Sequence, residues 1–196
     1  MTLADKITTS RLVFAPLFFI IFLLPRFFPS IGPALWTLPI LWVLFIVSEI
    51  TDMLDGKVAR KRGEVSDFGK LYDPFADTLT QITLFLCFVV DGILPALLFL
   101  LVLYREFSIL FVRNLLLRRG ITLGARMGGK IKTVSYIVAV GVALLASSLI
   151  RLGWAAEFHS WFLVAAQVVF ILSVLISIVS FVDYFIIFLK NSEKKS

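Results

Sequence analysis

The chain has 196 residues, of which 60% are hydrophobic and only 16% charged, and its mean hydropathy is +0.99. A typical soluble domain is roughly 45–50% apolar and about 25% charged. Apolar side chains this numerous cannot all lie inside so small a body, so much of the surface must face lipid. The composition therefore excludes a soluble fold, and the single cysteine, Cys87, excludes a disulfide scaffold and a cysteine zinc site.

Long apolar runs follow one another along the chain, and each is a candidate membrane-spanning helix. They are Leu12–Leu24, Ala34–Ile50, Phe75–Val90, Ile93–Leu117, Val134–Leu149 and Phe162–Leu189. Several are shorter than the roughly 20 residues that cross a bilayer core, so we expect the helices to extend into the flanking polar turns. The predicted fold class is an all-α polytopic membrane protein with six transmembrane helices. Residues 1–189 form one membrane domain in this prediction, and residues 190–196 form a basic cytoplasmic tail.

The basic residues indicate how the chain is oriented. When the 19 Lys and Arg residues are assigned to the loops, all but Arg26 and Arg151 fall on one side of the membrane. Cytoplasmic loops carry the excess of positive charge, so both termini are predicted to be cytoplasmic. The net charge of +6 then reflects topology, and no nucleic-acid partner is expected.

Acidic residues gather around the first long cytoplasmic connection. Asp52 and Asp55 are three positions apart, which separates them by only ~60° around a helix. Asp73 and Asp77 are four apart and about 40° from coincident. The spacing predicts two antiparallel helices that present four carboxylates to each other.

Four carboxylates at one place require a cation. Neighbours about 4 Å apart would repel by roughly 4 kcal/mol per pair at an effective dielectric constant of 20. A lysine or arginine is one possible partner. All-oxygen ligands without thiolate or imidazole are instead typical of Mg²⁺ or Mn²⁺, and the only histidine, His159, falls on the far side. We therefore favour one or two of these ions, bound by Asp52, Asp55, Asp73 and Asp77.

The residues after Asp55 suit a phosphate ligand. Gly56 and Ala59 leave room for a ligand to approach the backbone, and Arg60 supplies a planar phosphate donor. Together with divalent metals these residues are typical of diphosphate chemistry. The alternative for Gly56 alone is close helix packing.

Eight residues of this region have the spacing of a known signature. They are arranged as Asp52-x2-Asp55-Gly56-x2-Ala59-Arg60-x8-Gly69-x3-Asp73-x3-Asp77. This resembles the CDP-alcohol phosphotransferase (phosphatidyltransferase) family, whose members cleave a CDP-linked substrate and pass its phosphate-bearing part to an alcohol. The resemblance implies a six-helix membrane enzyme, commonly a homodimer, with a cytoplasm-facing site.

The resemblance also implies roles for individual residues. Asp77 would be the catalytic base, and the other aspartates mainly ligands of two metal ions. CDP would be bound by Asp52, Gly56, Ala59, Arg60 and Gly69.

Within the family the chain looks most like the phosphatidylglycerophosphate synthases. The supporting segments are Lys6–Thr8 with Arg11 and Pro16, Arg105-Glu106 with Arg113, and Gly129–Thr133. That likeness implies transfer from CDP-diacylglycerol to glycerol 3-phosphate by a bacterial inner (plasma) membrane protein. Thr78 stands where those synthases usually have lysine, which leaves the acceptor open.

The basic residues of the later spans fit a phosphorylated acceptor. Arg113 and Lys132, with Arg105 as a further candidate, are cations that could clamp its phosphate. The alternative is that these side chains only snorkel to the interface. Another acceptor such as inositol phosphate or serine, or an ion-coupled transporter, are the competing functions. No catalytic role is assigned to Glu49 or Asp183.

Overall fold

The computed structural model describes residues 3–28, 34–62, 67–118 and 127–193, and this part of the chain is helical throughout apart from short turns. Within these ranges, the side chains of residues 55–62 are among those that are not described. The elements are α1 (Leu3–Phe27), α2 (Ala34–Arg62), α3 (Asp67–Val90), α4 (Ala96–Arg118), α5 (Met127–Arg151), the short 3₁₀ helix η1 (Ala156–Phe158) and α6 (His159–Glu193). The predicted all-α class is confirmed, and every predicted span lies within or largely within one of the long helices.

Five of the described helices are long and apolar enough to cross a membrane. Only 28–44% of each apolar window is buried inside the protein, so the remaining surface faces lipid. The chain is an integral membrane protein. Helix α4 has 23 residues but does not join this group, because Arg105, Glu106 and Arg113 bring three charges into its middle. Arg105 and Glu106 are buried in the bundle together with apolar residues such as Val102 and Leu116, so these two charges do not face lipid.

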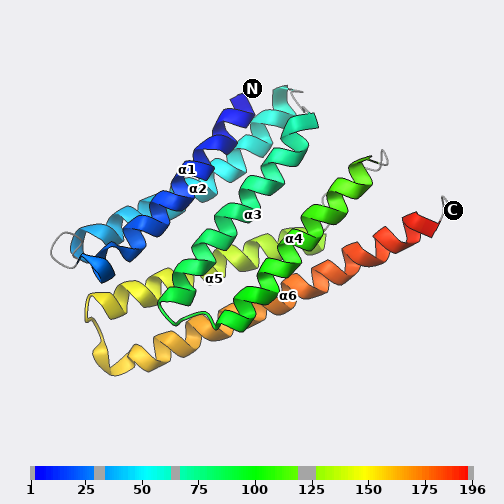
Figure 1. Cartoon of the computed structure of the whole chain (residues 1–196). Coiled ribbons are helices and arrows are strands. Elements are labelled where there is room, and N and C mark those ends of the chain that lie inside the picture. Colours follow the sequence, from blue (N-terminus) through cyan, green and yellow to red (C-terminus); the bar gives the residue numbers. More distant parts are fainter. Residues whose placement is uncertain (1–2, 29–33, 63–66, 119–126, 194–196) are drawn as a thin grey trace.

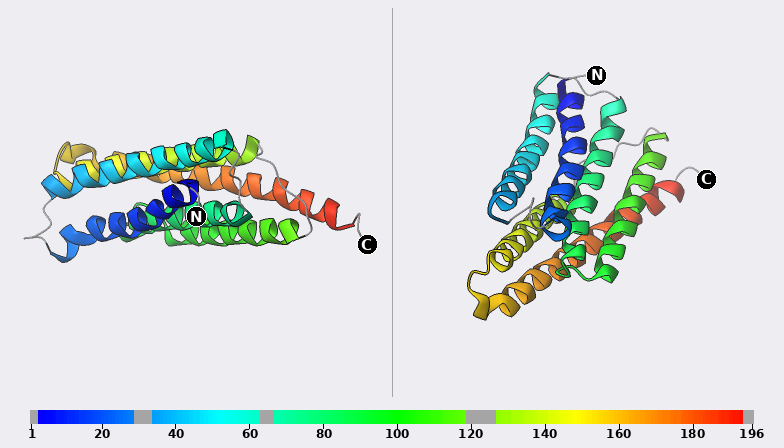
Figure 2. Two further views of the ribbon diagram at one scale, coloured as in Figure 1. Left: turned by 90° about the horizontal axis from the view of Figure 1, so that it is seen from above. Right: turned by 60° about the vertical axis from the view of Figure 1, so that its left-hand side comes forward.

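The helices run side by side, with their turns at two ends (Figure 1). Helix α1 lies between α2 and α3 and packs against both, whereas α6 packs against α4 and α5 (Figure 2). The two aspartate-bearing helices, α2 and α3, therefore pack mainly through α1, which the sequence did not predict, although Asp52 of α2 and Asp77 of α3 still meet at Arg11 of α1. Helical spacing fixes which residues share a face, but it does not decide which helix that face meets.

One end of the bundle, here called the far end, contains Phe27, Val90 and Arg151. At this end Arg151 contacts both carboxylate oxygens of Asp91 at 3.0 Å and donates to the carbonyl of Phe22 at 3.0 Å. Ser147 donates to the same carboxylate at 2.8 Å. These bonds tie α1 and α5 to the end of α3. The two basic residues assigned to the opposite side from the other cations, Arg26 and Arg151, both lie at this end, since Arg26 donates to the carbonyl of Val90 and Arg151 contacts Asp91.

The core beneath this network is rich in phenylalanine. The rings of Phe22 and Phe88 meet edge to face at 5.6 Å, and those of Phe85 and Phe170 do so at 5.1 Å. All four side chains are fully buried. These rings pack α1, α3 and α6 together. The polar site lies at the other end of the bundle, which we call the site end.

Candidate active site

Three helices bring the described aspartates together at the site end. Thr8 and Arg11 share one face of α1, since they are three residues apart. The hydroxyl of Thr8 donates to Asp73 of α3 at 2.8 Å. The Arg11 guanidinium forms ion pairs with Asp52 of α2 and Asp77 of α3, and its side chain is only 3% exposed. Helix α1 thus supplies the polar groups that connect these carboxylates.

Not all of the predicted metal and CDP residues can be placed. Asp55, Gly56, Ala59 and Arg60 belong to the last turns of α2, but their side chains lie outside the described residues. Gly69 is buried in α3. The structure therefore brings together Asp52, Asp73 and Asp77 around α1 and leaves the rest of the signature as a prediction.

The described carboxylates can be tested for their fit to a metal. One oxygen of Asp52 and one of Asp77 approach the same nitrogen, Nη1 of Arg11. Two oxygen donors from separate helices therefore converge on one cationic position, and this donor chemistry fits a hard divalent ion. Among the side chains that the structure describes, no group of three His, Cys, Asp or Glu residues is arranged to hold a metal.

A cavity of about 270 Å³ opens beside these carboxylates. That volume is far above the roughly 10–15 Å³ that one water requires. Its acidic lining includes Glu49, Asp52 and Asp77, and its basic lining includes Arg105, Arg113 and Lys132. The three residues predicted to hold the acceptor phosphate thus share one cavity with the predicted base.

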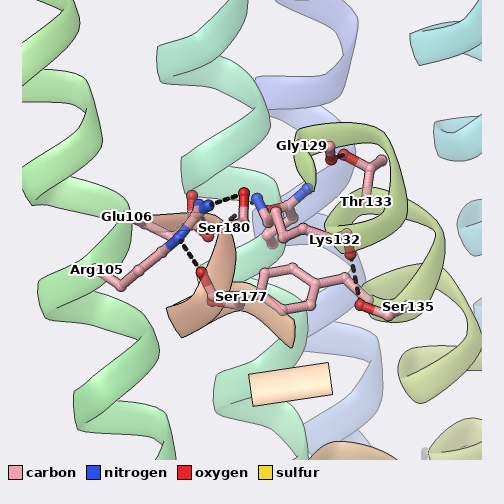
Figure 3. Close-up of polar contacts among 10 residues, drawn as sticks. Arg105, Glu106, Gly129, Lys132, Thr133, Ser135, Ser177 and Ser180 are labelled. Atoms are coloured by element: carbon pink, nitrogen blue, oxygen red, sulfur yellow. Dashed lines mark hydrogen bonds and ion pairs between the residues drawn. The ribbon is translucent and has the colours of Figure 1, made fainter. Parts of the chain in front are cut away.

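The basic wall of the cavity is organised by a buried carboxylate. Glu106 contacts Arg105 at 2.8 Å and Lys132 at 2.9 Å (Figure 3). Arg105 is 6% exposed and Lys132 8% exposed. The alternative that these two side chains snorkel to the membrane interface is therefore wrong, since both point into the bundle.

Three residues at this site were not predicted to have a role in it. Arg11 was counted with the topological charges, although the crowded aspartates required a cation. Gln81 lines the cavity, and its place one helical turn after Asp77 was a usable signal. Glu106 is the only acid in the mainly apolar sequence of α4, and an acid at such a position is itself a signal of a function inside the membrane.

This arrangement, a membrane-embedded helical bundle with carboxylates and cations around one cavity, defines a phosphate-handling membrane enzyme. Residues 1–179 match the family described as CDP-alcohol phosphatidyltransferase. The chain belongs to this family and is a phosphatidyltransferase of phospholipid biosynthesis. This family membership favours an enzyme over the alternative of an ion-coupled transporter.

The relatives that the chain resembles are bacterial. It is 38% identical over 191 residues to the CDP-diacylglycerol–glycerol-3-phosphate 3-phosphatidyltransferase of Treponema pallidum (strain Nichols), covering 94% of this chain and 88% of that one. It is 35% identical over 147 residues to the protein of the same name from Bacillus subtilis (strain 168), covering 73% and 76%. A cardiolipin synthase (CMP-forming) of Streptomyces coelicolor is 34% identical over 122 residues, covering 61% and 54%.

Proposed function

We propose that the protein transfers the phosphatidyl group of CDP-diacylglycerol to the hydroxyl of glycerol 3-phosphate, giving phosphatidylglycerophosphate and CMP. The observation that carries this proposal is the cavity whose lining combines the carboxylates of Asp52 and Asp77 with the cations of Arg113 and Lys132. Such a cavity offers separate places for a diphosphate with its counter-ions and for a second phosphate. The names of the Treponema and Bacillus relatives agree with this reaction.

Asp77 is the proposed base. Its carboxylate lines the cavity and accepts the proton of the acceptor hydroxyl. The hydroxyl oxygen forms a bond to the lipid-bearing phosphorus while the bond from that phosphorus to the CMP oxygen breaks. A base held within reach of the attacking hydroxyl contributes typically ~10²–10⁴-fold to such a step.

Asp52, Asp55, Asp73 and Asp77 are the proposed ligands of one or two Mg²⁺ or Mn²⁺ ions. When bound, the ions neutralise negative charge on the diphosphate and on the departing oxygen. The residues proposed to hold CDP are Asp52, Gly56, Ala59, Arg60 and Gly69.

The acceptor phosphate is proposed to bind Arg113 and Lys132, with Arg105 behind them. Glycerol 3-phosphate brings about two negative charges, and charge-assisted hydrogen bonds to cations are the stronger kind. Serine needs no such clamp, whereas inositol phosphate does. The basic wall therefore favours a phosphorylated acceptor.

We further infer that α4 is a sixth span, with Arg105 and Glu106 facing the bundle. Both termini and the site then lie on the cytoplasmic side of a bacterial inner membrane, as the distribution of basic residues favours. The lipid tails of the substrate and the surrounding lipids contact the outer faces of the helices. A homodimer is proposed from the family resemblance.

A direct assay tests this function. Purified protein is given CDP-diacylglycerol and glycerol 3-phosphate with Mg²⁺ or Mn²⁺, and the lipid product is identified by mass spectrometry. We expect phosphatidylglycerophosphate and an equal amount of CMP, both abolished by a chelator. A product formed only with serine would contradict the proposed acceptor, and full turnover in the chelator would contradict the proposed metals.

A further inference from the structure

Glu106 is a buried carboxylate that serves two cations at once. It is 4% exposed, and its Oε1 atom contacts both Nη1 of Arg105 and Nζ of Lys132. Two positive charges and one negative charge leave this group with one net positive charge. The group lines the cavity, so that charge is available to an anion there.

Each of the two cations is also held from a second side. Nζ of Lys132 donates to Oε1 of Gln81 at 3.0 Å, and Gln81 lies on α3 one turn after Asp77. Nε of Arg105 donates to the carbonyl of Ser177 on α6 at 3.2 Å. The Lys132 ammonium is thus held between Gln81 of α3 and Glu106 of α4, although it belongs to α5.

A free lysine would have little reason to stay at one point, because its four-carbon side chain is flexible. Here Glu106 and Gln81 remove that freedom before any ligand binds. Gln81 is on the same helix as Asp77, so the distance from the Lys132 ammonium to the Asp77 carboxylate is set by the protein. Fixing a recognition group relative to a reacting group is how orientation contributes to rate.

We propose that Glu106 is a positioning residue for the acceptor. Glu106 holds the ammonium of Lys132 in place, and Gln81 holds it from α3. An acceptor whose phosphate binds Lys132 then presents its hydroxyl to Asp77. This inference rests on the proposed function, since it assumes a phosphorylated acceptor.

A positioning role and a purely electrostatic role of Glu106 predict opposite changes in the affinity for the acceptor phosphate. Glu106→Gln keeps the side-chain volume and removes a negative charge beside the anion site. If Glu106 acted only through its charge, this change would tighten phosphate binding. A positioning role instead predicts weaker binding, because the ammonium of Lys132 loses its anchor.

The experiment is a double-mutant cycle read as the KM for each substrate. Glu106→Gln should raise the KM for glycerol 3-phosphate by about tenfold or more, the effect of one lost charge-assisted contact, and change that for CDP-diacylglycerol by less than about twofold. Lys132→Met should do the same. The double variant should be no worse than Lys132→Met alone, and Glu106→Asp should recover part of the loss.

A second variant keeps the test decisive if Glu106→Gln does not fold. Gln81→Leu removes the other anchor of Lys132 and leaves the carboxylate in place. It should raise the same KM by roughly threefold to tenfold, and it should have no effect once Lys132 is methionine. Asp91→Asn, which weakens the ion pair at the far end, is the matched control and should leave both KM values unchanged.

Several results would overturn the proposal. These are an unchanged or lowered KM for glycerol 3-phosphate in Glu106→Gln, equal effects on both substrates, or additive effects in the double variant. Wild-type protein that ignores glycerol 3-phosphate would overturn the proposed function and this inference with it. Normal wild-type activity with additive variants would overturn this inference alone.

Discussion

Arg11 is the residue on which the carboxylates of Asp52 and Asp77 converge. It is almost fully buried, whereas the side chains of Asp52 and Asp77 are 37% and 39% exposed. Removing one partner of a fully buried pair costs roughly 3–5 kcal/mol. Because the two acids are more than a third exposed, solvent screens their charges. We therefore expect Arg11→Gln to lower the free energy of unfolding by about 1–2 kcal/mol.

That loss should depend on divalent cations. Thermal unfolding in detergent should show a lower Tm for Arg11→Gln than for wild type without added metal. Mg²⁺ or Mn²⁺ should raise the Tm of the variant by more than that of wild type, because a metal ion replaces the missing positive charge. Equal shifts in the two proteins would show that the carboxylates do not need this charge.

Asp77→Asn tests the assigned base. Turnover should fall by at least ~10²–10⁴, the contribution of a lost general base. The Tm should change little, because the substitution removes one of two neighbouring like charges. Asp183→Asn, an exposed acid outside the cavity, is the matched control and should keep wild-type turnover. Near-normal turnover of Asp77→Asn at saturating substrates would mean that another group is the base.

Among the elements, α5 and α6 pack against each other near the site through Gly128 and Ser180. A Cβ atom on Gly128 would lie 3.3 Å from Oγ of Ser180 on α6, so this hydroxyl would have to give way by a few tenths of an ångström. At Gly141 the same atom would only meet the ring of Phe45 at 3.8 Å, an ordinary contact. The two glycines therefore form a matched pair within one helix.

Alanine substitutions at Gly128 and Gly141 should have different effects on stability. Gly141→Ala should raise the free energy of unfolding by about 0.5–1 kcal/mol, because alanine is the better helix former. Gly128→Ala should gain less than this or lose stability, because the new methyl group crowds Oγ of Ser180, which also accepts a hydrogen bond from Arg105. The Tm of each variant measures this difference. A higher Tm for Gly128→Ala than for Gly141→Ala would be incompatible with the close contact.

The elements themselves were largely predictable, and their neighbours were not. Apolar runs and their polar breaks locate every long helix, and the three- and four-residue spacings of the aspartates put them on shared faces. Periodicity describes only one helix at a time, so it could not predict that α1 stands between α2 and α3. For the same reason Arg11 was read as a topological charge rather than as the partner of Asp52 and Asp77.

The cations that line the cavity are a second case in which contacts between helices could not be predicted from the sequence. Arg105, Arg113 and Lys132 were predicted to bind the acceptor phosphate from their types and approximate positions, and the structure places all three at one cavity. The contacts that hold Lys132 were not predicted, because Glu106 and Gln81 lie 26 and 51 positions from it in the sequence. Only the packing of α3, α4 and α5 brings these groups together.

For the whole molecule, the predicted orientation separates two ends with different charge. The site end holds the carboxylates and most basic residues, and the far end holds Arg26 and Arg151. In a variant without Cys87, a cysteine at Glu157 should react with an impermeant maleimide in intact cells. A cysteine at Lys194 should react only after the membrane is opened. The reverse pattern would place the site outside the cytoplasm.

The central proposal is that the acceptor is glycerol 3-phosphate, and a competition between acceptors measures directly which one the enzyme uses. Purified protein receives CDP-diacylglycerol with equal concentrations of glycerol 3-phosphate, inositol phosphate and serine, and the lipid products are counted by mass spectrometry. We predict that phosphatidylglycerophosphate dominates. Arg113→Ala should then require roughly 10- to 150-fold more glycerol 3-phosphate for the same rate, with an unchanged KM for the lipid. A mixture dominated by phosphatidylserine, or an Arg113→Ala variant with wild-type KM values, would contradict a phosphate clamp at this site.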